Sequence, residues 1–248
     1  MEPVYRALEA TASLAVSVTG TKIGFCGLEH IPASDGAAVA INHTGYVDFL
    51  PAGLAARRRR RRLRFMLKAE MNDVPVVRFL IRHTGTIVVD RQAGAAAYAD
   101  AVRSLRSGEL VGVYPEATIS RSFELKDFKS GAARMALEAQ VPIVPLIVWG
   151  TQRIWTKDHP RAVGRKHFDV TVAVGAPISP RGTVEELLVT LRRDMTGLLH
   201  DAQAGHDHPP GAFWVPRRLG GSAPTPAEAE ALDAAERARR ARKRTGRA

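Results

Sequence analysis

A histidine and an aspartate five positions apart, His43 and Asp48, have the types and spacing for acid–base chemistry. They belong to the segment 42–48, Asn-His-Thr-Gly-Tyr-Val-Asp, in which a turn at Thr44 and Gly45 would fold the carboxylate back onto the imidazole. A carboxylate on one ring nitrogen fixes the tautomer and leaves the other nitrogen as a general base. The same residues also fit a loop histidine and an aspartate that caps the next helix.

Two further segments carry groups that suit an anionic substrate. Arg91 follows the short apolar run 86–89, and a guanidinium at a strand end can bind phosphate through two parallel hydrogen bonds. Glu116 follows another apolar run and precedes hydroxyls and Arg121, a set that suits a polyhydroxylated, phosphorylated ligand. Each group alone is equally compatible with an ordinary strand end or a helix cap.

The apolar segments before these residues alternate with helical patterns. We expect strands at 22–28, 37–41, 65–67, 86–89, 110–114, 143–148 and 168–174. We expect helices at 47–58, 75–83, 94–106, 131–139 and 184–202, the last with Thr183 as its N-cap. This rhythm predicts an α/β sheet with helices on its faces, in which ligands bind beyond the carboxyl ends of the strands.

Charge is concentrated in two tracts of the 248-residue chain, whose formal net charge is +11. Residues 57–64 contain seven arginines, and residues 237–248 contain six arginines and one lysine, with no acid in either tract. These fourteen cations leave a net charge of −3 on the rest of the chain. The pattern favours attachment to an anionic membrane surface over a broad nucleic-acid-binding face.

Composition and patterning also predict how the chain is divided. Residues 1–20 are expected to form an N-terminal helix that could contact a membrane, and residues 21–203 one α/β domain. Residues 204–248 read as a Pro/Gly-rich segment followed, from Pro224, by a helix-prone Ala/Glu/Arg tail, whose basic end is most simply described as disordered. No run approaches the roughly 20 apolar residues of a membrane span, and residues 1–6 lack the features of a secretory signal. We therefore expect a peripheral protein on the cytoplasmic face of the plasma membrane.

Three other features have competing interpretations. Cys26 could be a nucleophile, but it lies in a strand-like run without an adjacent base, so we expect a buried structural cysteine. The His-Asp-His segment 206–208 has no third ligand at metal-site spacing, which favours a solvated loop. The aromatic segment 213–216, followed by Arg217 and Arg218, fits a lipid interface and a strap for the tail equally well.

Taken in order, four segments resemble the motifs of the lysophospholipid acyltransferase family. The family's N-H-x-x-x-x-D motif is matched by Asn42, His43 and Asp48, and its glycine, short apolar strand and D-R by residues 85–91. The third motif, usually P-E-G-T-R-S, is matched at Pro115, Glu116 and Thr118, and the apolar fourth motif at residues 141–145. The resemblance covers about residues 20–180.

This resemblance implies a mixed, largely parallel sheet flanked by helices, and an O-acyltransferase that uses acyl-CoA or acyl carrier protein. The expected acceptor is the free hydroxyl of a lysophospholipid, foremost 1-acyl-sn-glycerol-3-phosphate, which would give phosphatidic acid. His43 would be the base and Asp48 its orienting partner. Substrate binding would fall to Asn42, Arg91, Glu116, Thr118 and Arg121. No metal or other cofactor is expected, because a thioester is already a good electrophile.

The third motif departs from the family pattern at two positions. Ala117 stands where glycine is usual, and Ile119 where an arginine usually helps to bind phosphate. Arg121 is expected to substitute for that arginine. A changed phosphate pocket would also suit another lipid alcohol, such as a phosphatidylinositol mannoside. An alternative of a different class, a basic nucleic-acid-binding protein, rests on net charge alone and lacks any readout pattern, so no nucleic acid is expected as a partner.

Overall fold

The computed structural model of the chain describes residues 10–11, 13–14, 16–68, 85–89, 94–162 and 164–245. Over these residues, seven strands form one sheet in the order β1-β7-β6-β2-β5-β3-β4. The strands are β1 (Lys22–Cys26), β2 (Ala37–Ile41), β3 (Leu63–Lys68), β4 (Ile87–Val89), β5 (Leu110–Val113), β6 (Ile143–Trp149) and β7 (Asp169–Val174). The helices are α2 (Phe49–Arg58), α4 (Gly94–Arg106), α5 (Gly131–Ala139), α6 (Val184–Ala204) and α7 (Pro226–Thr245).

The sheet is mixed and mostly parallel, as predicted. The central strand β2 pairs in parallel with β5 on one side and with β6 on the other, whereas β6 and β7 are antiparallel. Because β2 and β5 run in the same direction, the loops that follow them meet at one edge of the sheet.

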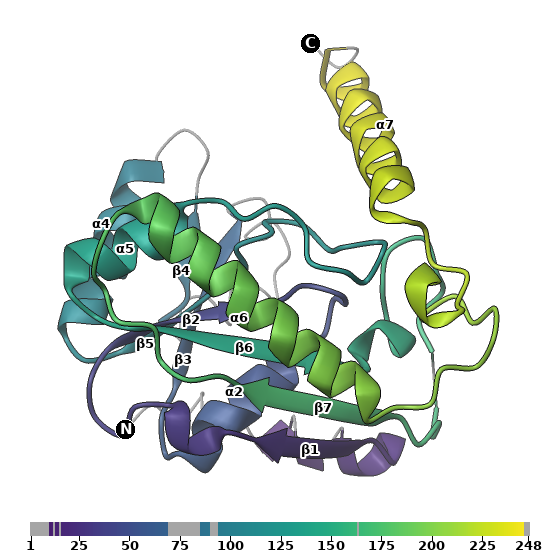
Figure 1. Cartoon of the computed structure of the whole chain (residues 1–248), viewed down its shortest axis with the longest axis horizontal. Coiled ribbons are helices and arrows are strands. Elements are labelled where there is room, and N and C mark those ends of the chain that lie inside the picture. Colours follow the sequence, from purple (N-terminus) through teal and green to yellow (C-terminus); the bar gives the residue numbers. More distant parts are fainter. Residues whose placement is uncertain are drawn as a thin grey trace.

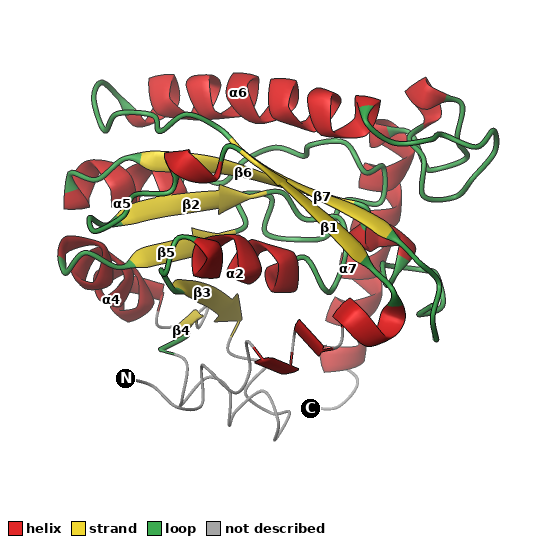
Figure 2. Cartoon of the chain, turned by 90° about the horizontal axis from the view of Figure 1, so that it is seen from below, coloured by secondary structure: helices red, strands yellow, loops and turns green. Residues whose placement is uncertain are grey.

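Helices cover both faces of the sheet (Figure 2). Ala38 and Ala40 of β2 pack into a core with α4, α5 and α6, while the alternate residues Ala37, Val39 and Ile41 pack against α2. Every residue of β2 is buried, which explains why its sequence is a continuous apolar run rather than an alternating one. The core therefore holds the end of β2 rigidly from both sides.

Most predicted elements are confirmed. Strand 37–41 and helices 94–106 and 131–139 have the predicted bounds. Helix α6 begins with a capping box in which Thr183 and Glu186 exchange side-chain-to-backbone hydrogen bonds. The described residues between 10 and 19 are helical, with Leu14 and Val18 exposed. The helix predicted at 75–83 lies outside the described residues.

The C-terminal segment forms the helix that its composition from Pro224 onward favours, rather than a disordered tail. Residues 226–245 form α7, which Figure 1 shows in yellow, extending from the body of the molecule. Asp233 is buried, because this helix contacts the domain through charged side chains rather than an apolar stripe. The local sequence indicates the helix but not which cations elsewhere in the chain pair with its acids.

The aromatic segment before α7 forms a strap. Val215 is fully buried, the Phe213 ring stacks on His159 with centroids 4.1 Å apart, and Arg153 lies over the Trp214 ring. Of the two interpretations that the sequence left open for this segment, the structure therefore favours attachment of the C-terminal segment to the domain.

The arginine tract 57–64 has a partly structural role. Arg57 and Arg58 form the last turn of α2, where cations interact favourably with the helix dipole. Arg61 donates to the carbonyls of Pro32 and Gly108, both at 2.6 Å. Part of this tract therefore fixes loops. Among the described residues, none of the helices has the length and apolar character that crossing a bilayer requires.

Candidate active site

The first and third motifs lie in loops at the carboxyl ends of two neighbouring parallel strands. His43 follows β2 directly, and Glu116 follows β5 after a two-residue connection. The backbone N–H of His43 donates to Glu116 Oε1 at 2.8 Å, and that of Ser120 donates to the His43 carbonyl at 2.8 Å. These contacts confirm that segments more than seventy residues apart meet at one site.

His43 and Asp48 form the pair that their spacing predicted. Their Nδ1 and Oδ2 atoms are 3.0 Å apart, with the Asp48 side chain fully buried and the His43 side chain 21% exposed. A carboxylate can only accept, so Nδ1 carries the proton and Nε2 remains the basic nitrogen. The ring also stacks on Tyr114, with centroids 4.2 Å apart. The imidazole is therefore held in one orientation.

Asp48 is fixed by donors other than His43. Its Oδ2 atom accepts from the backbone N–H groups of Thr44 at 2.8 Å and Gly45 at 2.9 Å. The hydroxyl of Thr151, in the turn after β6, donates to Oδ1. These donors compensate the carboxylate for its loss of water. Thr151 was missed by the sequence analysis, although its place just beyond a parallel strand was the available signal.

Gly45 allows the loop to close over Asp48. A Cβ atom there would lie 2.9 Å from the Trp155 carbonyl oxygen and 3.1 Å from that of Thr151. The backbone N–H of Tyr46 donates to the same Trp155 carbonyl at 2.9 Å. Glycine at this position thus permits the close backbone approach that brings Thr151 to the carboxylate.

Glu116 joins the two loops. It is buried, and its Oε1 and Oε2 atoms accept from the backbone N–H groups of His43 and Lys126 at 2.8 and 3.0 Å. Burial raises the pKa of Glu116 to about 8, against the opposing effect of the two backbone hydrogen bonds. Its observed role is to position His43, and its expected contact with an acceptor hydroxyl stays a prediction.

Asn42 also positions the catalytic loop. Its side chain has no exposed surface, and its amide donates to the Val148 carbonyl at 3.1 Å and accepts from the Val148 N–H at 2.7 Å. These bonds connect the residue that follows β2 to β6, and so continue the contact between the two strands beyond their backbone pairing. The structure thus gives Asn42 a positioning role, and the substrate contact that the family resemblance implied stays a prediction.

The predicted phosphate ligands have different outcomes. Arg91 lies outside the described residues, so its contact with an acceptor phosphate stays a prediction. Thr118 accepts a hydrogen bond from Lys126 Nζ at 2.7 Å, and Arg121 is paired with carboxylates of which two come from α7.

Ile119, one of the two departures from the third motif, is buried. Ala117 has φ 59°, a left-handed conformation that glycine adopts without strain, in agreement with the glycine usual in the family.

The other candidate reactive residues lie away from this arrangement. Cys26 is exposed on the edge strand β1, so the prediction that it is buried was wrong. Partial burial and the nearby acids Glu29 and Asp201 raise its pKa, opposite to the shift that a nucleophilic thiolate needs. His206 hydrogen-bonds Thr171 through Nε2 at 2.9 Å, and the described part of the chain contains no group of three residues suited to hold a metal.

A buried carboxylate that orients a partly exposed imidazole, at the carboxyl ends of parallel strands, is an arrangement suited to general acid–base chemistry. Residues 22–149, more than half of the chain, match the family model described as Acyltransferase. The chain belongs to this family.

Curated relatives agree with this assignment. The chain is 26% identical over 162 residues to a 1-acyl-sn-glycerol-3-phosphate acyltransferase from Borreliella burgdorferi, covering 61% of this chain and 60% of the relative. It is 28% identical over 123 residues to a protein of the same name from Bacillus subtilis, covering 49% and 60%. The matches thus span about 60% of these relatives' lengths.

The fold is similar to that of a crystal structure of the 1-acyl-sn-glycerophosphate acyltransferase PlsC from Thermotoga maritima. The TM-score is 0.69 at 22% sequence identity, over 82% of this chain and 81% of that one. This likeness confirms the predicted fold class, a mixed, largely parallel sheet with flanking helices.

Proposed function

We propose that this protein transfers a fatty acyl group from acyl-CoA or acyl carrier protein to the free hydroxyl of a lysophospholipid. The proposed acceptor is 1-acyl-sn-glycerol-3-phosphate, and the product is phosphatidic acid. The observation that carries the proposal is the His43–Asp48 pair, with its 3.0 Å contact, buried carboxylate and partly exposed ring. The names of the two curated relatives support this acceptor.

The geometry suits a direct transfer. Nε2 of His43 would accept the proton of the acceptor hydroxyl while its oxygen attacks the thioester carbonyl carbon. As the tetrahedral intermediate collapses, the carbon–sulfur bond breaks, and the imidazolium returns the proton to the departing thiolate. Asp48 stabilises the imidazolium that forms between these two transfers and keeps Nε2 directed at the substrate. Each of these steps uses groups of this chain and its two substrates.

Exposed aromatic rings beside the site support action at a lipid surface. Tyr46, Phe49 and Trp155 have 43%, 42% and 37% of their surfaces exposed, and the rings of Tyr46 and Trp155 lie 4.7 Å apart. Aromatic side chains are favoured at the boundary between water and acyl chains. The exposed arginines at the end of α2 would add attraction to anionic headgroups. We propose peripheral attachment to an anionic membrane through this face.

The function is tested by mass spectrometry of the products formed from palmitoyl-CoA and a mixture of lysophosphatidic acid, other lysophospholipids and phosphatidylinositol mannosides. We expect phosphatidic acid as the main product, and acylated mannosides alone would assign the alternative acceptor. His43→Ala should lower the rate of transfer by about 10²- to 10⁴-fold, whereas His200→Ala, which removes an exposed histidine of α6, should leave it unchanged. Normal turnover by folded His43→Ala protein would contradict the mechanism.

The membrane proposal has a separate test. Sedimentation with vesicles of phosphatidylglycerol should remove the protein from solution at low salt, and vesicles of phosphatidylcholine should leave most of it behind. Equal binding to both would contradict electrostatic attachment.

A further inference from the structure

The side chain of Arg121 lies in a pocket of carboxylates. Its Nε atom donates to Asp158 Oδ2 at 2.5 Å, and one terminal nitrogen donates to Glu236 Oε2 at 2.9 Å. The other terminal nitrogen is paired with Asp233. The Arg121 side chain is only 7% exposed, so these acids replace water as its hydrogen-bond partners. Two of the three come from α7.

Two lysines complete a cationic cluster around the same α7 carboxylates. Lys157 Nζ lies 3.3 Å from Asp233 Oδ1 and 3.2 Å from Glu236 Oε2. Lys126 is also paired with Asp233, and its Nζ donates to Thr118 Oγ1. The cluster therefore places three cations from the body of the protein against two acids of one helix.

The α7 acids are ionised in this environment. Burial disfavours the charged form of Glu236, but hydrogen bonds from Arg121 and Lys157 outweigh burial and lower its pKa to about 2. Burial likewise opposes ionisation of Asp233, and its bonds to Lys126 and Lys157 again give a net lowering of its pKa. At neutral pH, α7 thus presents two negative charges to the cluster.

The cationic cluster is bonded directly to the catalytic loop. The backbone N–H of Lys126 donates to Glu116, whose other oxygen accepts from the backbone N–H of His43. Ser120, which precedes Arg121, donates its N–H to the His43 carbonyl. In Figure 2, α7 lies on the side of the molecule toward which β2 points. Backbone hydrogen bonds thus connect the segments that carry Arg121 and Lys126 to the loop that carries His43.

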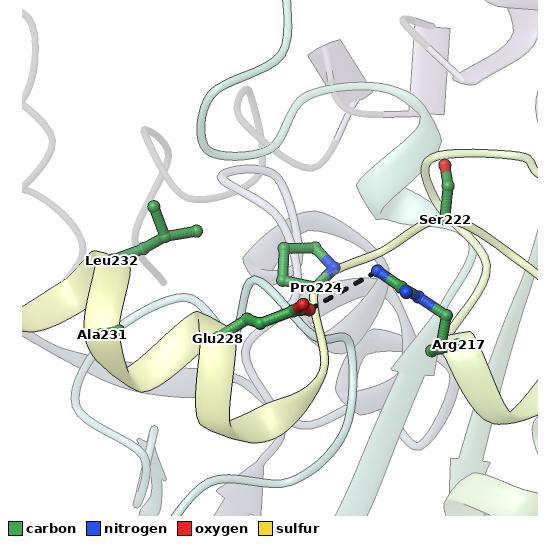
Figure 3. Close-up of a pocket in the computed structure, with 6 residues that line it drawn as sticks. All are labelled: Arg217, Ser222, Pro224, Glu228, Ala231 and Leu232. Carbon is green, nitrogen blue, oxygen red and sulfur yellow. Dashed lines mark hydrogen bonds and ion pairs between the residues drawn. The ribbon is translucent and has the colours of Figure 1, made fainter.

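Helix α7 is held to the body mainly by charge. Among its described side chains, Ala229 and Asp233 are buried and Glu236 is partly buried. These three residues lie on one face of the helix. The other described side chains of α7, including Leu232, are exposed. A hollow of about 460 Å³ lies at the base of the helix, and Figure 3 shows the residues that line it, among them Arg217 and Leu232. An element with so little apolar contact can be displaced by a competing anion.

We propose that Arg121, Lys126 and Lys157 form a binding site for a phosphate monoester, and that Asp233 and Glu236 of α7 occupy it as an internal competitor. A phosphate monoester carries close to two negative charges at neutral pH, which equals the charge of the two carboxylates it would displace. The inference rests on the proposed function, since the acceptor's headgroup supplies this phosphate. In this arrangement α7 blocks the acceptor site until a phosphorylated lipid displaces it.

Calorimetric titration of the full chain with glycerol 3-phosphate tests the competition. Asp233→Asn combined with Glu236→Gln removes the competing charges with little change of shape, and should raise the affinity at least tenfold. A matched control, Glu185→Gln with Glu230→Gln, removes two exposed acids outside the cluster and should change the affinity less than twofold. Unchanged affinity in a folded Asp233→Asn/Glu236→Gln protein would overturn the proposal.

A second measurement needs no variant. Hydrogen–deuterium exchange of the wild-type chain should become faster at residues 229–236 when glycerol 3-phosphate saturates the site, and should not respond to glycerol. Glycerol 3-phosphate that binds without changing exchange there would refute displacement of α7. Lys126→Met with Lys157→Met should remove binding, and retained affinity would exclude these lysines.

Two further comparisons distinguish a lipid headgroup from free phosphate as the ligand, and the binding-site proposal from the proposed acyl transfer. A headgroup site should bind glycerol 3-phosphate more tightly than inorganic phosphate, and equal affinities would assign the site to free phosphate instead. In the transfer assay, Asp233→Asn/Glu236→Gln should lower KM for lysophosphatidic acid and leave KM for palmitoyl-CoA unchanged. If no acyl product forms but α7 still competes with glycerol 3-phosphate, the proposed function fails while the binding site stands.

Discussion

Replacement of Asp48 by asparagine changes the charge of the site with almost no change in shape. In the wild type, Oδ2 accepts three N–H groups, from His43, Thr44 and Gly45. An amide oxygen at that position keeps the three bonds but loses the charge, at a cost of about 1 kcal/mol for each bond. The amide nitrogen then faces Thr151, whose hydroxyl can rotate to accept. We expect a loss of about 3 kcal/mol, which for a chain of this size lowers Tm by about 9 °C.

The same substitution should have a larger effect on catalysis. The retained hydrogen bond keeps the proton on Nδ1, but without the carboxylate the imidazolium of His43 loses the negative charge that stabilises it. The contribution of general base catalysis is about 10²- to 10⁴-fold, so we expect kcat to fall within this range. The assay follows radiolabelled palmitate from palmitoyl-CoA into phosphatidic acid, below the Tm of the variant.

Two comparisons make this prediction decisive. His43→Ala should reduce kcat by a similar factor, and the double variant should be little worse than either single one, because the two residues act as a unit. Asp48→Asn protein with a lowered Tm but a kcat within threefold of the wild type would refute the reasoning. Asp48 would then only stabilise the loop, and His43 would not depend on it.

Three further predictions concern stability. Thr151→Val removes the hydroxyl that donates to Asp48 and should cost about 2 kcal/mol, seen as a Tm lower by about 6 °C; an unchanged Tm would exclude this bond. Burial raises the pKa of Glu116 from 4.5 to about 8, so the folded state retains its proton to higher pH than the unfolded state does. Stability should therefore fall as the pH rises from about 5 to 8, and Glu116→Gln should flatten that profile; parallel profiles would contradict the shift. Thr183→Ala breaks the capping box of α6 and should cost about 1 kcal/mol, measured by urea unfolding, with acyl transfer unaffected.

The fold was largely predictable because its strands and helices have strong local patterns. The continuous apolar run at 37–41 and the alternation with helices specify a sheet covered on both faces. The pairing of His43 with Asp48 was predictable for the same reason, since they are five positions apart with a glycine-containing turn between them. Contacts of this range depend on local geometry, which the sequence encodes directly.

The roles of buried polar side chains were harder to predict from the sequence. Asn42 and Glu116 were correctly placed at the site, but whether a polar side chain faces a substrate or a neighbouring backbone depends on what packs around it. Both are bonded to backbone groups, Asn42 to Val148 and Glu116 to His43 and Lys126. Cys26 shows the converse error: a strand-like pattern does not reveal that its strand lies at the edge of the sheet.

The sequence by itself determined the α/β architecture, the His43–Asp48 pair and the family, because periodicity and short-range spacing carry that information. Only the tertiary structure decided that Thr151 holds Asp48 and that α7 places Asp233 against Arg121. These partners are more than a hundred residues apart in the chain. No local pattern specifies such a pairing; it arises because the packed sheet brings distant loops to one edge, where unlike charges meet.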